Sequence, residues 1–163
     1  MNTRDAIRST MDLGSMVMKQ YLSDLSDAEL LIRPGKGCNH IAYQLGHLIS
    51  SEWGLLEAIA PGSAPELPAG FKQTYEKENA QSDDPQQFCT KQQYLDLFEK
   101  LNAATLKALN GTSDADLDQP SPERLRKMFP TVGMIYVLIA THPLMHAGQF
   151  VPVRRALGKP VLI

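Results

Sequence analysis

Two of the four histidines in the sequence, His142 and His146, are four residues apart, which is one turn of an α-helix. Residues at this spacing lie on the same helix face, so the two imidazoles can chelate one metal ion. That face is otherwise mainly apolar, with Ile135, Ile139, Gln149 and Val153. Taken alone, the pair is more often two histidines at the edge of a core, hydrogen-bonded to backbone carbonyls or water.

A third histidine, His47, favours a metal site over two histidines at the edge of a core. His47 lies on a strip of polar and small residues at helical spacing, together with Tyr43, Ser50 and Gly54. If the helix that contains His47 faces the helix of the pair, three imidazoles meet at one point. Three protein ligands leave a coordination position open, as in catalytic metal sites. The sequence therefore predicts one divalent metal ion on His47, His142 and His146.

The spacing also excludes related metal motifs. A zincin protease has a glutamate directly after its first histidine, whereas residues 143–145 are Pro-Leu-Met. The Glu-x-x-His pairs typical of ferritin-like two-metal sites are missing from the sequence. His40 is about 10 Å from His47 along the same helix, because each residue rises 1.5 Å, so we expect His40 outside the metal site. It lies at the pocket rim, hydrogen-bonds the Arg33–Gly37 loop, or is a surface residue.

Other polar residues near the triad receive weaker assignments. Gln149, about one turn after His146, is predicted to line the pocket and to contact a bound cofactor or ligand. Arg154 and Arg155 either hold an anionic cosubstrate or are solvated surface charges. Glu52 and Glu57 do not share the face of His47 cleanly, so we assign them no catalytic role.

The two cysteines, Cys38 and Cys89, are too far apart for a paired zinc or redox motif, and we expect free thiols. Cys38 precedes a predicted helix start, where a helix dipole can lower a thiol pKa. The plainer interpretation is an inert, half-buried cysteine.

Four amphipathic segments at the helical period have to position the histidines. Asn39, Thr90 and Thr131 are the expected N-caps of the last three, and Gly111 and Gly158 the expected C-terminal stops. Ser26 and Glu29 form a capping-box pattern for one short turn. The four segments cover residues 4–23, 39–60, 90–110 and 131–157.

Two connections and two prolines complicate this pattern. Residues 61–89 are rich in Pro, Gly, Ser and Asp, with at most a helical piece near 71–80, and form either a lid or a simple crossover. Residues 112–130 are a polar connection. Pro143 and Pro152 fall inside the last helix, where a kink is expected and the carbonyl of Ile139 becomes free to bond a histidine.

The fold class that follows is all-α, a four-helix bundle with a long connection between its second and third helices. At 163 residues we expect a single domain over 1–163. Hydrophobic residues at 43% and charged residues at 21% are typical of soluble globular proteins. With a net charge of −2, no basic stripe, no signal peptide and no membrane-length apolar run, we expect no nucleic-acid or membrane partner and a cytoplasmic location.

Three stretches of the chain resemble the DinB/YfiT-like superfamily of metal-binding four-helix bundles. They are Arg33-Pro34 followed by residues 39–48 (Asn-His-Ile-Ala-Tyr-Gln-Leu-Gly-His-Leu), then Thr131-Val132-Gly133, then residues 142–149 (His-Pro-Leu-Met-His-Ala-Gly-Gln) with Arg154-Arg155-Ala156-Leu157-Gly158. Through this resemblance His47, His142 and His146 match a histidine triad that holds nickel, zinc or iron. Pro143 departs from the pattern, in which polar residues often separate the last two histidines.

The resemblance leaves the reaction open, because related proteins include thiol-dependent S-transferases and a mycothiol-dependent isomerase. We expect a metal-dependent enzyme of the thiol S-transferase or hydrolase type, acting on a small molecule, with a low-molecular-weight thiol as one option. The alternative is a non-catalytic metal- or ligand-binding module, and a purely structural bundle ranks third. The oligomeric state is open, with a homodimer as one option.

Overall fold

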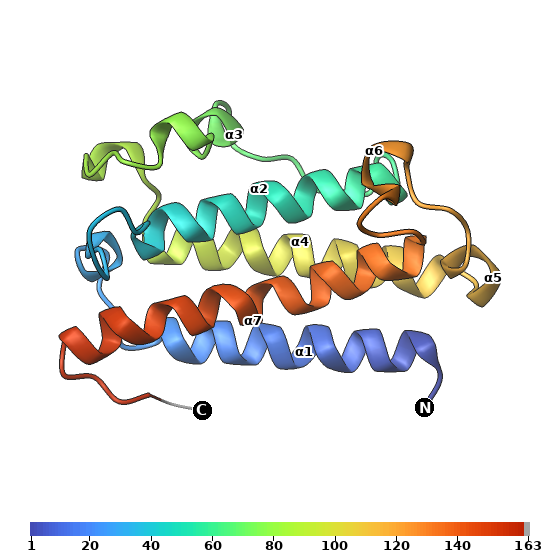
Figure 1. Cartoon of the computed structure of the whole chain (residues 1–163), viewed down its shortest axis with the longest axis horizontal. Coiled ribbons are helices and arrows are strands. Elements are labelled where there is room, and N and C mark those ends of the chain that lie inside the picture. The colour runs from blue at the N-terminus through green and yellow to red at the C-terminus, as the bar shows by residue number, and fades with distance from the viewer. Residues whose placement is uncertain (162–163) are drawn as a thin grey trace.

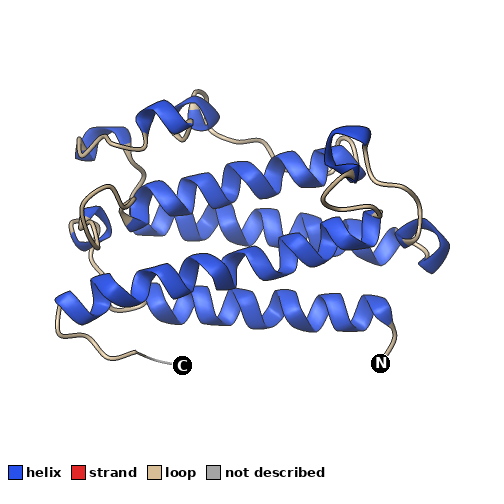
Figure 2. Cartoon of the chain, in the orientation of Figure 1, coloured by secondary structure: helices blue, strands red, loops and turns tan. Residues whose placement is uncertain are grey.

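Four long helices run side by side and form the body of the protein in a computed structural model that describes residues 1–161 (Figure 1). They are α1 (Thr3–Leu22), α2 (Ile41–Ile59), α4 (Lys91–Gly111) and α7 (Val132–Ala156). In the described part, β structure is limited to a single bridge between Pro120 and Thr131 (Figure 2). The predicted all-α four-helix bundle is therefore confirmed.

Six short helical segments lie in the connections. The turn predicted at Ser26 and Glu29 is present, since the Glu29 carboxylate accepts from the Ser26 amide and the Ser26 hydroxyl accepts from the Glu29 amide. The segments are η1 (Glu29–Leu31), α3 (Phe71–Thr74), η2 (Lys77–Asn79), η3 (Pro85–Gln87), α5 (Asp114–Leu117) and α6 (Glu123–Arg126).

Within residues 1–161, no helix has the length and apolar character needed to span a membrane.

The helix ends follow local hydrogen-bonding rules, with two differences from prediction. Thr90 and Thr131 cap α4 and α7 as predicted, and Gly158 follows α7 with a positive φ of 69°. The expected stop at Gly111 is wrong, because α4 includes Gly111 and Thr112 is the C-cap. Asn39 is not the N-cap of α2: His40 takes that position, with its Nδ1 accepting from the Tyr43 amide at 3.0 Å.

The most extensive helix contact is between α1 and α7, and a glycine makes it close. A Cβ added to Gly14 would lie 3.0 Å from the carbonyl oxygen of Ala140 and 3.6 Å from the Cβ of Pro143. Any larger residue at position 14 would push the two helices apart. Gly14 thus sets the position of the α7 segment that contains the histidine pair.

The long connection between α2 and α4 folds back along α2 (Figure 1). Tyr75 is 4% exposed, and its ring lies so close to Gly46 of α2 that an added Cβ would be 2.1 Å from it. The Tyr43 hydroxyl donates to the carbonyls of Tyr75 and Glu76, both at 3.3 Å. Tyr75 therefore fastens this connection to α2.

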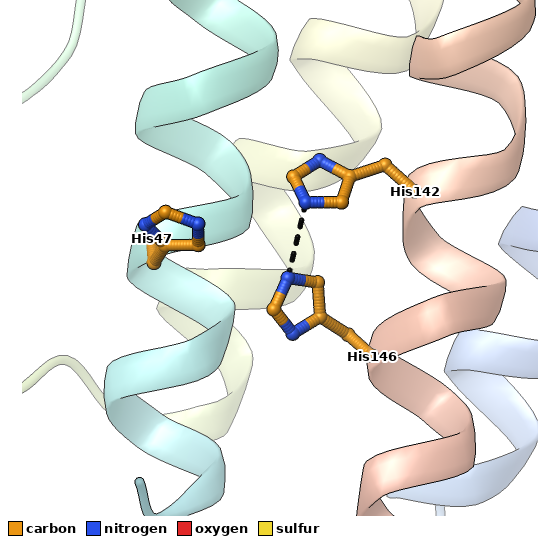
Figure 3. A group of neighbouring side chains, drawn as sticks. All are labelled: His47, His142 and His146. Carbon is orange, nitrogen blue, oxygen red and sulfur yellow. Dashed lines mark hydrogen bonds between the residues drawn. The ribbon is translucent and has the colours of Figure 1, made fainter.

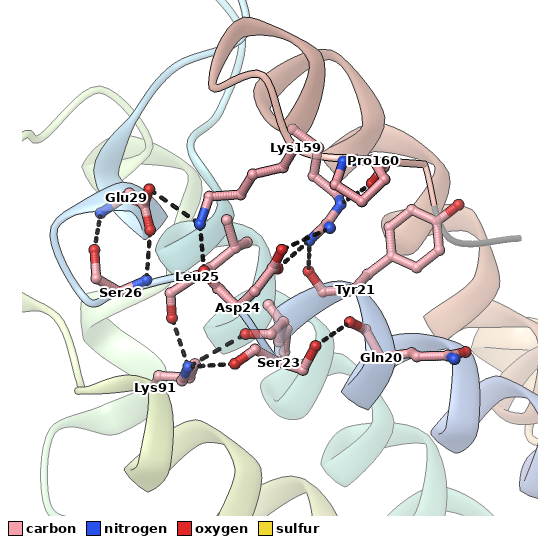
Figure 4. Close-up of polar contacts among 12 residues, drawn as sticks. Gln20, Tyr21, Ser23, Asp24, Leu25, Ser26, Glu29, Lys91, Lys159 and Pro160 are labelled. Atoms are coloured by element: carbon pink, nitrogen blue, oxygen red, sulfur yellow. Dashed lines mark hydrogen bonds and ion pairs between the residues drawn. The ribbon is translucent and has the colours of Figure 1, made fainter.

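Arg154, near the C-terminal end of α7, binds residues at the C-terminal end of α1, where Figure 4 labels Tyr21 and Asp24. It is fully buried and forms a bidentate pair with Asp24, at 2.6 and 3.0 Å. Its remaining N–H groups reach the carbonyls of Tyr21 and Pro160, and its hydrogen bonds hold the pKa of Asp24 below the ordinary value. Both sequence interpretations of Arg154, a cosubstrate ligand or a solvated charge, are therefore wrong.

Replacing Gly46 and Gly54, both on α2, separates the Tyr75 contact from helix propensity. Gly46→Ala should lower the free energy of unfolding by about 1–3 kcal/mol, because the new methyl overlaps the Tyr75 ring. Gly54→Ala should raise it by about 0.5–1 kcal/mol, since an added Cβ there meets nothing within 4 Å and alanine favours the helix. Urea denaturation followed by circular dichroism measures both, and equal effects of the two changes would contradict the assigned contact.

Candidate metal centre

Three histidines from two helices converge at the seam between α2 and α7 (Figure 3). One nitrogen each from His47, His142 and His146 lies within 4.8 Å of the other two. The Nε2 atoms of His142 and His146 are 3.2 Å apart. Among the described residues, no other group of three or more His, Cys, Asp or Glu side chains has such an arrangement.

The helices bring these rings together because α2 and α7 pack along each other in opposite directions (Figure 1). His142 and His146 project from the inner face of α7, and His47 approaches from the more exposed edge of α2. Pro143 and Pro152 do not interrupt α7, which is helical from Val132 to Ala156. Pro143 is buried, and its ring packs beside Gly14 of α1.

We expected a histidine ring N–H to donate a hydrogen bond to the Ile139 carbonyl, and this bond is not formed. The buried Nδ1 of His142 has no hydrogen-bond partner, and the Nδ1 of His146 bonds to a side chain of α2 instead. The prediction was wrong because the i, i+4 face directs both rings away from their own helix backbone, across the seam.

Gln44, which sequence analysis did not single out, sets the orientation of His146. Its Nε2 donates to the Asn39 carbonyl at 2.9 Å, so its Oε1 is the atom that faces the Nδ1 of His146, at 3.0 Å. Because that oxygen can only accept, His146 carries its proton on Nδ1 and has its Nε2 lone pair free for a metal. One feature of the sequence could have identified Gln44: it precedes His47 by three residues, about one helical turn.

Burial keeps the three imidazoles uncharged near neutral pH. Together with the weaker effect of the neighbouring histidines, burial lowers the pKa of His146 to about 3 and that of His142 to about 4. Burial also lowers the pKa of His47. Since a metal binds the neutral imidazole, the ligands need no deprotonation before binding at neutral pH.

A pocket of about 470 Å³ opens beside the rings of His47 and His146. Its wall includes Gln44 and Gln149, and the connection between α2 and α4 contributes Tyr75 and Lys77. Gln149 lies where the sequence predicted a pocket residue, and its contact with a ligand stays a prediction. The connection forms part of the pocket wall, so it is more than a crossover between two helix ends.

The sequence matches one family. The model of the DinB superfamily matches residues 11–150, which is most of the chain and includes all three histidines. The chain belongs to the DinB superfamily. Comparison with curated protein sequences finds no match.

Two solved structures share the fold of this DinB-superfamily protein. A conserved protein from Enterococcus faecalis is 18% identical, with a TM-score of 0.73 over 98% of this chain and 99% of that one. YfiT from Bacillus subtilis is 16% identical, with a TM-score of 0.66 over 96% of this chain and 89% of that one. YfiT is described as a probable metal-dependent hydrolase with an unusual four-helix bundle topology.

Several polar residues of the DinB-superfamily chain lie outside the triad. His40 is outside it as predicted, but the expected rim or surface position is wrong: His40 is fully buried, and its Nε2 bonds to the Ser82 carbonyl at 3.0 Å. The Glu57 carboxylate accepts from the amides of Gly62 and Ala64 and so caps the loop after α2. Arg155 is exposed and does not line the pocket.

Glu52 and the cysteines are also separate from the pocket. Glu52 is 3% exposed, its Oε1 has no hydrogen-bond partner, and burial raises its pKa well above the ordinary value. It does not line the pocket, so it has no contact with a ligand bound there. Cys38 is exposed and Cys89 is half-buried, and both are free thiols as expected. Burial raises the pKa of Cys89, which makes this thiol less reactive.

Replacing two histidines of the α2 region should separate folding from metal binding. His47→Ala should weaken divalent-metal affinity more than about 100-fold, beyond the range typical of outer-sphere changes, because it removes a ligand. His40→Ala should leave the affinity of folded protein unchanged but lower the unfolding free energy by about 1–2 kcal/mol, because it removes the α2 cap. Zinc titration calorimetry with thermal unfolding measures both, and equal losses of metal affinity would contradict the ligand assignment.

Gln44→Leu should weaken metal affinity by about 10–100-fold, because His146 loses the acceptor that fixes its tautomer. Gln149→Leu is the matched control in the same pocket, because Gln149 makes no hydrogen bond to the histidines. If Gln44→Leu and Gln149→Leu bind zinc equally well in the same titration, Gln44 has no role in metal binding.

Proposed function

We propose that this DinB-superfamily protein is a metal-dependent enzyme that binds one divalent transition-metal ion, nickel, zinc or iron, on His47, His142 and His146. The observation that carries the proposal is the convergence of three neutral imidazoles beside an open pocket. Three nitrogen ligands are the protein contribution to many catalytic metal sites. The description of YfiT as a probable metal-dependent hydrolase supports the same class of function.

The histidine pair of α7 has a spacing that fits such an ion. Two ligand atoms about 2.0–2.1 Å from a tetrahedral zinc ion lie about 3.3 Å from each other. The Nε2 atoms of His142 and His146 are 3.2 Å apart, and Gln44 already holds the tautomer of His146 that binds metal. When bound, the ion would supply Lewis acidity, which makes water or a thiol a better nucleophile near neutral pH.

The residues around the triad favour a thiol as the nucleophile. No carboxylate lines the described pocket, and the tyrosine there that contacts His47, Tyr43, has a pKa raised by burial. A nucleophile must therefore lose its proton without a strong side-chain base. A thiol, with a pKa near 8.5, does this far more readily than water. The thiol proton passes to solvent water, the thiolate sulfur bonds to an electrophilic carbon, and the leaving group departs from that carbon with the bonding electron pair.

A non-catalytic binding module is the second candidate, and the same lack of a carboxylate base favours it. Such a module would bind the metal and a small ligand without turnover. Metal binding alone does not distinguish the two functions, so the test has to measure chemistry as well as occupancy.

The tag-free protein should contain about one divalent transition metal per chain, and the His47, His142 and His146 triple alanine variant should contain none. Metal-loaded protein should consume an electrophile such as monochlorobimane faster than the uncatalysed reaction in the presence of bacillithiol, mycothiol or glutathione. Elemental analysis and fluorescence measure the two outcomes.

Removal of the metal with a chelator should abolish the thiol reaction, and adding the metal back should restore it. Turnover of ester substrates in water without thiol would instead support a hydrolase. Metal binding without any turnover would support the binding module, and wild-type protein that stays metal-free after reconstitution would exclude all three functions.

A further inference from the structure

The pocket beside the triad has an unbalanced charge. Its one charged lining residue is Lys77, and the other described lining residues are neutral amides, tyrosines and histidines. Histidine ligands, unlike carboxylates or thiolates, bring no negative charge, so the triad would offset none of the charge of a divalent ion. With metal bound, the site and Lys77 together present about three positive charges and no carboxylate, a potential that attracts anions.

We propose that the substrate is a small molecule with an anionic group, a carboxylate or phosphate, that Lys77 binds while another atom of the same molecule faces the three histidines. This inference rests on the proposed function and names the chemical class of its substrate. A pocket of about 470 Å³ is within the range for small-molecule sites.

Lys77 is available for this contact. The other ion pairs of the described chain use Arg4, Lys19, Arg33, Arg154 and Lys159, and no described hydrogen bond or ion pair engages the Lys77 ammonium group. Its sequence neighbours Glu76 and Glu78 are exposed and do not line the pocket. Burial is the main cause of the raised pKa of Tyr43, and the Glu78 carboxylate adds to it, so this carboxylate is near enough to weaken the positive potential.

The fold holds the backbone of Lys77 at the pocket. Tyr75, two residues earlier, is fixed by its ring against Gly46 and by a hydrogen bond between its hydroxyl and that of Tyr94, at 2.5 Å. The Tyr43 hydroxyl binds the two carbonyls that precede Lys77, and η2 begins at Lys77 itself. The Lys77 side chain is exposed, and these contacts fix the position of its backbone on the pocket wall.

The chain offers a matched lysine for the test. Lys72 lies in the same connection and is also exposed, but its ammonium group lies over the Trp53 ring, 3.0 Å from the centroid, and it does not line the triad pocket. Lys72→Gln therefore removes the same charge from the same segment without removing the proposed contact.

The probes are 3-mercaptopropionate and its neutral methyl ester, titrated into the cobalt-loaded protein. Changes in the cobalt absorption bands report binding of either probe without requiring turnover. The ratio of the two dissociation constants gives the preference for the anionic group. We expect wild type to prefer the acid, Lys77→Gln to reduce this preference by about two- to five-fold, and Lys77→Arg to retain it.

Two further variants test the sign and the location of the charge. Glu78→Gln should increase the preference for the acid, and Lys72→Gln should leave it at the wild-type value. The effect of Lys77→Gln should shrink in 0.5 M salt, because salt screens exposed charges.

Each other outcome counts against the inference. Equal preferences in wild type and Lys77→Gln, or equal effects of Lys77→Gln and Lys72→Gln, would overturn it while cobalt binding and the proposed function remained intact. Cobalt bands that neither probe changes would overturn it together with the thiol reaction. Protein without cobalt bands would overturn the proposed function itself, and this inference with it.

Discussion

The packing of α2 against α7 is the contact on which the candidate site depends. It brings Gln44 and His47 of one helix to the histidine pair of the other, and neither helix has the site alone. A shift of one helix by one turn, about 5.4 Å, would separate Gln44 from His146 and open the triad. The close approach of α1 at Gly14 holds α7 from its other side, next to Pro143. The geometry of the site is therefore fixed by the register of α2 against α7.

The site has an energetic cost that the rest of the bundle has to offset. His142 and His146 are buried and neutral, the Nδ1 of His142 has no partner, and Glu52 is a further buried group without one. A buried polar group without a hydrogen bond costs about 1–3 kcal/mol. The helix caps, and Arg154 with its hydrogen bonds to Tyr21 and Asp24, lie toward the ends of the helices, away from the seam. Stabilising contacts are thus placed where they do not occupy the ligand positions.

The sequence predicts the parts of this structure that depend on local spacing. The four helices and the caps at Thr90 and Thr131 follow from the helical period and capping chemistry, and so does the common face of His142 and His146. His40, Gln44 and Arg154 were assigned wrongly or missed, because their partners are distant in the chain: Ser82, His146 and Asp24, respectively. Polarity suggests an exposed position for such residues, whereas a specific partner permits burial. Long-range pairing of this kind is not contained in the periodicity of one helix.

The extensive contact between α1 and α7 affects how the chain can fold during its synthesis on the ribosome. α1 is made first, but the helix that covers it follows more than a hundred residues later, and so do two of the three histidines. At translation speeds of about 5–20 residues per second, the face of α1 that α7 covers stays uncovered for several seconds. During that interval the nascent chain has neither a closed core nor a complete triad. A metal ion that needs all three histidines would therefore bind only after α7 has been made and has packed against α2.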